Sequence, residues 1–323
     1  MTSPAFVVIA GPTATGKTQA AIALARRISA EIVCADSRAL YRGMDIGTAK
    51  PSRADRASVP HHLLDVADPD HVVTLAEYQH RAGRAFQEIR ARGRIPILAG
   101  GTGLYIRAIV DRVTIPPVPP DWDLRARLEE AERLEGPGTL YRRLGEVDPA
   151  AASRIHPRNL RRIIRALEVH ARAGAAISTL QSQVGSTGWA PAAAPAEPAV
   201  MVALTMDRGR LYERIDRRID EQLARGLVEE VRTLLAAGYA RTLPAMQGLG
   251  YKEIADHLDG AATLGEAVAR LRRNSRRLAK RQWTWFRADP RYRWLDVGDD
   301  PVPEVAARIH AIMSEAARPG GRP

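Results

Sequence analysis

The sequence of 323 residues predicts an α/β fold in which helices flank a parallel sheet and an all-helical domain is inserted into the core. Three observations support this prediction. Short apolar runs alternate with segments of helical periodicity near the N-terminus, which is typical of a parallel, doubly wound sheet. Glycines follow two of these runs, at the strand ends where such sheets bind ligands. Two proline-containing stretches then enclose a segment with helical patterns and no strand pattern.

Apolar runs bounded by polar or glycine residues predict the strands of the core. They lie at residues 6–10, 31–35, 95–99 and 200–204, with a short strand possible at 61–66. Apolar residues spaced three or four apart predict the helices. We expect these at 17–28 and 74–92, as one or two helices over 210–237, and as a last long helix over 264–287. Residues 38–60 are interpreted as an irregular stretch, too polar for the core and long enough to suggest a function.

Prolines set the predicted domain boundaries, because they cannot continue a helix and stiffen a linker. The two proline-containing stretches cover residues 114–120 and 185–199, and an amphipathic helix at 161–169 lies between them. Asp148 and Arg158 mark two helix starts in this segment. We therefore expect a core of residues 1–115 and 200–315, a helical insertion of residues 116–199, and a disordered tail of residues 316–323.

Charge is the unusual feature of the composition. Lys and Arg number 48 against 37 Asp and Glu, a net charge of +11, which favours a polyanionic partner such as nucleic acid. The one cysteine, Cys34, excludes an intrachain disulfide and suits a reducing cytoplasm. Its apolar neighbours predict a buried thiol rather than a reactive one. No apolar run reaches the ~18 residues that a membrane helix needs, so we expect a cytoplasmic protein that does not span a membrane.

Residues 11–18, Gly-Pro-Thr-Ala-Thr-Gly-Lys-Thr, fit the pattern G-x-x-x-x-G-K-[ST] between an apolar run and a helical pattern. In this pattern backbone N–H groups and a helix N-terminus bind phosphate oxygens, while Lys17 supplies a cation and Thr18 offers its hydroxyl to Mg²⁺. The alternative is a chance glycine turn between strand and helix. The motif predicts a P-loop NTPase-like core, although it does not say whose phosphate is bound.

Two further strand ends are expected beside this loop, because the carboxyl ends of parallel strands share one edge of the sheet. Asp36 ends the strand that we place beside the phosphate strand, and it could bind Mg²⁺, hold a hydroxyl, accept a proton or cap the following turn. Glycines and Thr102 follow the strand 95–99, where Thr102 could orient a ligand or simply belong to a tight turn. No Asp ends that strand, which argues against an ATPase motor.

Residues 270–294 carry ten basic residues, one acidic residue and five aromatic residues. Positive charge beside aromatic planes is typical of proteins that hold single-stranded RNA. The alternative is a solvated helix whose aromatic residues all belong to the core. A second basic cluster, in the insertion, comprises Arg158, Arg161, Arg162 and Arg165. Arg214, Arg217 and Arg218 begin a helix, and one of them could bind phosphate by forked hydrogen bonds, but the sequence does not tell which one.

A series of motifs runs in order from residue 11 to residue 287. They are GPTATGKT at 11–18, DS at 36–37, YRGMDIGTAKP at 41–51, PHHL at 60–63, GGTGLY at 100–105, RALEV at 165–169, GLGYKE at 248–253, KRQ at 280–282 and TWFR at 284–287. Together they resemble the tRNA dimethylallyltransferase family, also called tRNA isopentenyltransferases. The resemblance implies that the loop holds the diphosphate of dimethylallyl diphosphate rather than ATP. It also implies transfer of the dimethylallyl group to N6 of adenosine 37, 3′ of the anticodon of tRNA.

The resemblance also implies roles for individual residues. Asp36 would be the general base, Thr102 would place the adenine, and Lys17 and Arg218 would hold the leaving diphosphate together with Mg²⁺ on Thr18. The implied diphosphate-binding residues are Gly11, Thr13, Ala14, Thr15, Gly16, Lys17, Thr18 and Arg218. The implied tRNA-binding residues are Asp36, Ser37, Arg38, Ala39, Thr102, Arg161, Arg162, Arg165, Gln247, Gly248, Gly250, Lys252, Arg273, Arg276, Arg277, Lys280 and Arg281. The family pattern is variable at residues 38–39. The expected partners are the anticodon stem-loop and dimethylallyl diphosphate, bound by a monomer.

Three alternative functions remain open at this stage. The first is a small-molecule kinase with ATP in the loop and Asp36 activating a substrate hydroxyl. The second is an RNA-binding NTPase or scaffold without transfer chemistry, and the third is an enzyme that prenylates free adenine nucleotides. The basic C-terminal region argues against the kinase and the free-nucleotide enzyme, because neither needs a surface that binds RNA.

Overall fold

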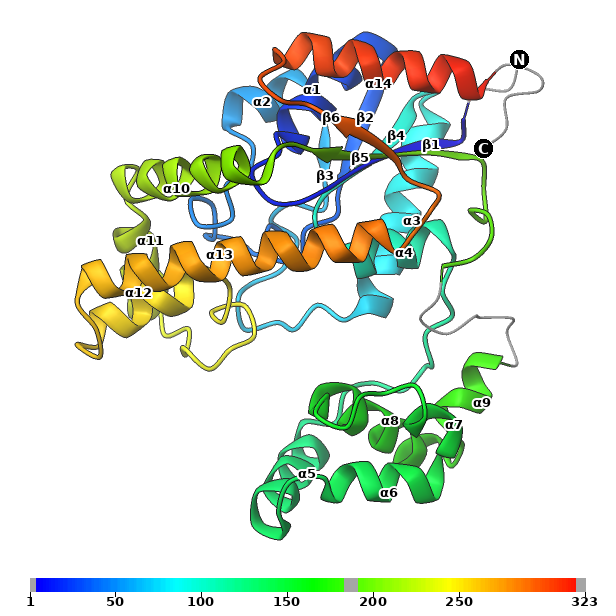
Figure 1. Ribbon diagram of the computed structural model, residues 1–323, viewed down its shortest axis with the longest axis vertical. Coiled ribbons are helices and arrows are strands. Elements are labelled where there is room, and N and C mark those ends of the chain that lie inside the picture. The colour runs from blue at the N-terminus through cyan, green and yellow to red at the C-terminus, as the bar shows by residue number, and fades with distance from the viewer. Residues whose placement is uncertain (1–3, 183–190, 318–323) are drawn as a thin grey trace. The chain divides into compact units, whose positions relative to one another are not determined.

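The computed structural model describes residues 4–182 and 191–317, and the chain forms two compact units (Figure 1). The larger unit comprises residues 1–111 and 194–323, and the smaller one residues 112–193. The predicted boundaries at 115/116 and 199/200 lie a few residues later in the chain than these. Among the described residues no helix is both long and apolar enough to cross a membrane.

The larger unit is built on a six-stranded sheet in the order β3-β2-β4-β1-β5-β6, with every pair of neighbours parallel. The strands are β1 (Phe6–Ala10), β2 (Ala30–Cys34), β3 (His61–His62), β4 (Ile95–Ala99), β5 (Ala199–Thr205) and β6 (Arg293–Asp296). The predicted α/β class with a parallel sheet is therefore confirmed. One placement was wrong, because β4 lies between β1 and β2, so Asp36 does not follow a strand adjacent to the phosphate strand.

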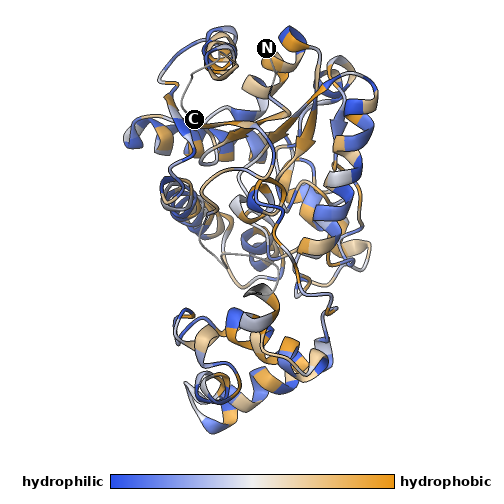
Figure 2. Ribbon diagram, turned by 90° about the vertical axis from the view of Figure 1, so that its right-hand side faces the viewer, coloured by the Kyte–Doolittle hydropathy of each residue, from blue (hydrophilic) through white to orange (hydrophobic). Residues whose placement is uncertain are grey.

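Helices cover both faces of this sheet (Figure 1). One face carries α1 (Lys17–Ile28) and α14 (Val302–Ala316), which pack against each other. The other face carries α3 (Leu75–Ala91) and α4 (Gly103–Val110), and α13 (Leu264–Arg287) contacts α4. Figure 2 shows the apolar strands in the interior, where Val7, Val8 and Ile9 of β1 are fully buried.

Three more helices extend the larger unit beyond the carboxyl ends of its strands. They are α10 (Arg208–Ala224), α11 (Leu227–Ala236) and α12 (Tyr251–Leu258), and both α10 and α12 contact α13. We had expected Arg214, Arg217 and Arg218 to begin this helix. Asp207 caps α10, so the three arginines lie in the middle of the helix instead. The buried side of α10 includes Ile215 and Ile219, which confirms its predicted apolar stripe.

Several elements were not predicted. They are α2 (Arg53–Ser58), α4, α12, β6 and α14, so α13 is not the last helix. The polar helix α2 buries no residue and therefore gives no periodic signal; a capping box between Ser52 and Asp55 holds it. Strand β6 is only four residues long and is recognised by its pairing with β5 rather than by its pattern. The stretch 38–60 was wrongly judged too polar for the core, because Leu40, Tyr41 and Met44 are buried.

The smaller unit is entirely helical in its described part. Its helices are α5 (Trp122–Glu135), α6 (Thr139–Val147), α7 (Pro149–Ala152), α8 (Leu160–Ala173) and α9 (Ile177–Ser182). Leu140, Leu144 and Ile163 are fully buried in a separate small core. Asp148 caps α7, as its sequence predicted. Within the predicted tail, α14 ends at Ala316 and residues 318–323 lie outside the described part of the chain.

Candidate active site

Three strand ends meet at one edge of the sheet, as the sequence predicted. The N–H of Ala35, after β2, donates to Ala99 O at 2.8 Å, and the N–H of Gly100 donates to Ile9 O of β1 at 3.1 Å. The N–H of Thr102 returns a bond to Ala35 O at 3.0 Å. A Cβ at Gly100 would lie 2.1 Å from Ala35 O, so this approach requires glycine.

The loop of residues 11–16 wraps the N-terminus of α1. Gly11 has a φ of 135°, and a Cβ there would lie 2.4 Å from Leu204 O on β5. Gly16 is left-handed and turns the chain into α1, whose first turn contains no acidic residue and no side-chain cap. The unpaired N–H groups of such a helix start attract anions. The loop therefore has the backbone form of a phosphate cradle.

Lys17 and Arg218 place two cations beside this loop. The Lys17 ammonium donates to Pro12 O at 2.5 Å. Burial, and then the nearby Arg218 guanidinium, lower the pKa of Lys17 to about 7, while Asp36 acts in the opposite direction. Burial also lowers the pKa of Arg218, again opposed by Asp36. An anion bound here would restore the charge on Lys17, because an opposite charge favours the ionised form.

A cleft of about 510 Å³ opens beside the loop. Ala14, Gly16, Lys17 and Thr18 form one side of it, and residues 49–52 together with Asp55 form another. The third side is α10, with Arg214, Arg217, Arg218, Glu221, Gln222 and Arg225. All three arginines between which the sequence could not choose therefore line the cleft, and Arg218 is the one that acts electrostatically on Lys17.

Asp36 and Thr102 follow the neighbouring strands β2 and β4. One oxygen of the half-buried Asp36 carboxylate accepts the N–H of Arg38 at 2.8 Å, which is the turn-capping role that the sequence left open. Among the described residues its second oxygen has no hydrogen-bond partner. Thr102 Oγ1 accepts the N–H of Ser37 at 3.0 Å, which leaves the hydroxyl proton to donate. The pair thus offers one acceptor and one donor to a ligand.

Gln282 is a site residue that the sequence reasoning missed. From α13 its Oε1 accepts the N–H of Thr13 in the loop at 2.8 Å, and its Nε2 donates to Gly101 O at 3.0 Å. A Cβ at Gly101 would lie 2.4 Å from this nitrogen. The only signal was the KRQ motif, in which a glutamine beside two cations does not reveal a bond 269 residues away.

The aromatic residues of the C-terminal segment do not form an exposed stacking surface. Phe286 and Tyr292 are buried and meet edge to face at 5.3 Å. Trp285 packs so closely on α4 that a Cβ at Gly103 would lie 2.1 Å from its indole nitrogen. Trp283 and Trp294 pack against the core and against the Arg287 guanidinium. The expectation that these rings hold RNA bases was therefore wrong. The alternative interpretation, in which the aromatic residues pack against the core, is the one that fits the structure.

The basic residues of α13 divide into paired and unpaired groups. Arg276 pairs with Asp216 and lies over Tyr212, while Arg272 pairs with Asp220. These two aspartates come from α10, so part of the positive charge of α13 is neutralised by acidic residues that lie elsewhere in the sequence. Arg273, Arg277, Lys280 and Arg281 are exposed and have no ion-pair partner among the described residues. Arg273, Arg277 and Lys280 line an open groove of about 540 Å³ between α10 and α13.

The remaining predicted residues are less clearly available to a ligand. The Arg38 guanidinium donates to Pro244 O, and Ala39 is buried. The Gln247 side chain donates to Arg241 O at 2.6 Å, while Lys252 is exposed. Gly248 and Gly250 contribute backbone turns around the start of α12, where the Gly250 N–H donates to Glu253.

In the smaller unit the three arginines predicted to bind tRNA differ in burial and in hydrogen bonding. Arg165 donates to the fully buried Glu168 and to Val118 O, so it serves the interior of that unit. Arg161 is exposed, and Arg162 is half-buried. Burial lowers the pKa of Arg162.

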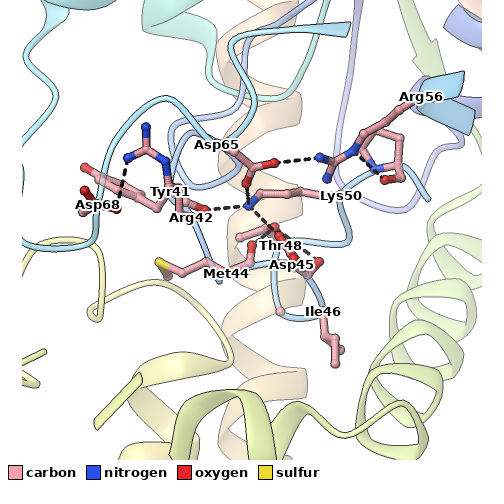
Figure 3. A network of polar contacts seen from close by, with 12 residues as sticks. Tyr41, Arg42, Met44, Asp45, Ile46, Thr48, Lys50, Arg56, Asp65 and Asp68 are labelled. Carbon is pink, nitrogen blue, oxygen red and sulfur yellow. Dashed lines mark hydrogen bonds and ion pairs between the residues drawn. The ribbon is translucent and has the colours of Figure 1, made fainter. Parts of the chain in front are cut away.

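Lys50 is a cation in the cleft wall whose charge is already neutralised (Figure 3). Its side chain is 1% exposed, and its ammonium contacts Asp45 at 2.6 Å and Asp65 at 2.5 Å. It also donates to Tyr41 O at 2.5 Å, while Arg56 holds the other oxygen of Asp65 at 2.6 Å. The network anchors the stretch that we had interpreted as irregular.

Cys34 is not part of this chemistry. Burial raises the pKa of its thiol to about 12, so the thiol stays protonated at neutral pH. The residue is half-buried rather than fully buried and packs against the core, and the prediction of an unreactive thiol agrees with the raised pKa.

Comparisons with known proteins agree with this arrangement. The family model "IPP transferase" matches residues 39–289. A protein of Desulforudis audaxviator named tRNA dimethylallyltransferase is 52% identical over 94% of this chain and 96% of its own length. The crystal structure of the full-length tRNA isopentenylpyrophosphate transferase from Bacillus halodurans is 40% identical, with a TM-score of 0.69 over 97% of each chain. A eukaryotic dimethylallyltransferase acting on tRNA is 25% identical, with a TM-score of 0.77 over 95% of this chain and 77% of its own.

Proposed function

The chain belongs to the IPP transferase family, and we propose that it transfers the dimethylallyl group of dimethylallyl diphosphate to N6 of adenosine 37 in tRNA. The products are N6-dimethylallyladenosine and diphosphate. The observation that carries the proposal is the meeting of a phosphate cradle, two cations and one carboxylate with a free oxygen at a single edge of the sheet.

The cradle suits a diphosphate leaving group. As the allylic C–O bond breaks, the electron pair stays on the bridging oxygen, and negative charge grows there. Lys17 and Arg218 lie beside each other at the loop, where they stabilise this charge. Gly11, Thr13, Ala14, Thr15 and Gly16 supply the backbone of the cradle, and Thr18 lies in the first turn of α1 beneath it.

The residues present also fit a Mg²⁺ ion that is held largely by the diphosphate. Thr18 lines the cleft, and the described residues contain no group of three or more His, Cys, Asp or Glu side chains that could hold a metal. Such a sparse protein contribution is usual for Mg²⁺, which binds substrate phosphates through one or two protein ligands and several waters. When bound, the ion would neutralise charge on the leaving diphosphate.

Asp36 and Thr102 suit the nucleophile. The N6 amine attacks the terminal allylic carbon, and the proton that it loses passes to the free oxygen of Asp36. Thr102 keeps its hydroxyl proton to donate to the adenine, while its oxygen holds the backbone next to Asp36. Gln282 supports both the diphosphate-binding loop and the residues that contact the adenine, because it connects the loop to the turn that carries Thr102.

The RNA side of the proposal rests on charge rather than on aromatic stacking. Arg273, Arg277, Lys280 and Arg281 are exposed cations that can contact phosphates of the anticodon stem-loop. Arg161 offers a similar contact from the helical insertion. Extrusion of the target base into the site would be offset by contacts in the pocket. A tRNA substrate also agrees with the cytoplasmic location that the composition suggested.

The proposal is tested by incubating the protein with undermodified tRNA, Mg²⁺ and either dimethylallyl diphosphate or ATP, followed by digestion and mass spectrometry of the nucleosides. We expect N6-dimethylallyladenosine only with the prenyl donor. Turnover of ATP without a modified nucleoside would instead support the kinase alternative.

The role of Asp36 has its own test. Asp36→Asn should abolish turnover while tRNA affinity changes little, because the amide keeps the turn-capping oxygen and loses the basic one. Turnover is measured by radiolabel transfer and affinity by filter binding. Equal loss of both would assign Asp36 a structural role.

A further inference from the structure

The loop of residues 45–48 leads into one side of the cleft, and its backbone is held by residues far along the chain. The N–H groups of Asp45, Ile46 and Gly47 all donate to the carboxylate of Glu230 on α11, at 2.9, 2.7 and 3.0 Å. Three successive N–H groups on one carboxylate form a charge-assisted cluster, which is stronger than the same number of neutral bonds. Glu230 therefore fixes the course of this loop.

The carbonyl groups of the same loop point to α10. Gln222 Nε2 donates to Ile46 O at 2.8 Å and to Gly47 O at 2.9 Å. One turn earlier on α10, Arg218 Nη2 donates to Thr48 O at 3.4 Å. The loop is thus held between α11, which binds its N–H groups, and α10, which carries the diphosphate-binding arginine.

Glu230 also connects this loop to α12. The buried Tyr251 hydroxyl donates to Glu230 at 2.6 Å. A Cβ at Gly47 would lie 2.6 Å from the Tyr251 ring, so glycine is needed for the loop to pack here. Beyond the loop, Ala49 and Lys50 line the cleft, and the bond between Lys50 and Asp45 closes the turn (Figure 3).

We propose that Glu230 is a positioning residue for the diphosphate donor. Its carboxylate sets the 45–48 backbone, which presents the Thr48 carbonyl to Arg218 and leads into residues 49–52 on one side of the cleft. In Glu230→Gln an NH2 group replaces one carboxylate oxygen, so at least one of the three N–H groups loses its acceptor, residues 45–48 shift, and the bond between Arg218 and Thr48 O weakens. Donor binding then suffers more than the chemical step, because Asp36 and Thr102 are held by other contacts. The inference rests on the proposed function for the identity of the donor.

The test compares Glu230→Gln with the matched control Glu229→Gln. Glu229 is the neighbouring residue on α11, and within the part of the chain that the structure describes its one ion pair is with Arg232 on the surface. For each variant we would measure the Kd for inorganic diphosphate with Mg²⁺ by calorimetry, and then KM for dimethylallyl diphosphate, KM for tRNA and kcat. We expect Glu230→Gln to raise the Kd and the donor KM about tenfold or more, equivalent to about 1.4 kcal/mol. The tRNA KM and kcat should change little, and the control should match wild type.

A general loss of fold would not produce this pattern, and a second variant guards against it. Tyr251→Phe removes the hydroxyl, and with it the bond to Glu230 and the contact with the Thr48 backbone of the same loop, and we expect a rise of about fivefold in the diphosphate Kd. If Glu230→Gln does not fold, this variant decides the matter. A folded variant that binds diphosphate like wild type, or that loses kcat and both KM values equally, overturns the inference. Failure of the wild-type protein to prenylate tRNA would instead overturn the proposed function, because the diphosphate measurement does not require transfer.

Discussion

Replacing Gln282 by Met tests whether the contact between α13 and the phosphate loop holds the active site together. Methionine is close to glutamine in length and volume, so the substitution removes two hydrogen bonds without opening a cavity. The Thr13 N–H loses its acceptor at 2.8 Å, and the Gly101 carbonyl loses its donor at 3.0 Å. Both groups lie at the partly buried junction of the loop, the glycine turn and α13.

The expected loss follows from these two bonds. Each contributes about 1 kcal/mol net, so the free energy of unfolding should fall by about 2 kcal/mol. For a unit of roughly 150–250 residues this corresponds to a decrease in Tm of about 4–8 °C. The donor KM should also rise several-fold, because the Thr13 backbone belongs to the cradle.

Differential scanning calorimetry measures the first effect and steady-state kinetics the second. Thr284→Ala is a suitable control, since its hydroxyl donates only to Lys280 O within the exposed side of α13. A surface change of this kind should cost less than about 0.5 kcal/mol. If Gln282→Met melts with the control and binds the donor like wild type, the bridge contributes nothing to the site and the reasoning fails.

Two further predictions concern charged groups. Hydrogen bonds from Arg92 hold the pKa of Glu31 below its usual range, and the Glu31 side chain is 2% exposed. A lowered folded pKa stabilises the fold above the unfolded pKa, so the Tm advantage of wild type over Glu31→Gln should be full at pH 7 and shrink below about pH 4. An equal advantage in thermal melts at pH 7 and pH 3 would contradict this. Arg277→Ala should weaken tRNA binding and reduce its salt slope by about one, whereas Arg276→Ala, which breaks the pair with Asp216, should also lower Tm. If the salt dependence of tRNA affinity in filter-binding titrations is unchanged, the RNA-binding surface does not include these residues.

Local patterns predicted what depends on local physics. The strands β1, β2, β4 and β5 and the helices α1, α3 and α13 were predicted within a residue or two, because continuous apolar runs and 3.6-residue periodicity reflect burial directly. Helix α2 was not predicted because it is short and polar and buries no residue. Strand β6 was not predicted because it is defined by its pairing with β5 and not by a pattern in its own sequence. The aromatic residues of α13 were misjudged because composition does not say which way a ring points.

The features of the site likewise fall into those that local sequence patterns predict and those that only the structure reveals. The phosphate loop, Asp36 and the glycine turn with Thr102 are recognisable from the sequence, since each follows an apolar run at the edge where parallel strands end. The order of the strands, with β4 between β1 and β2, required the structure, because several orders suit the same alternation of strands and helices. So did the contacts of Gln282 with Thr13 and of Glu230 with residues 45–47, which join segments more than 180 residues apart. Side chains that act at such separation follow no sequence period, and only the packing of α10, α11 and α13 beyond the sheet brings them to the site.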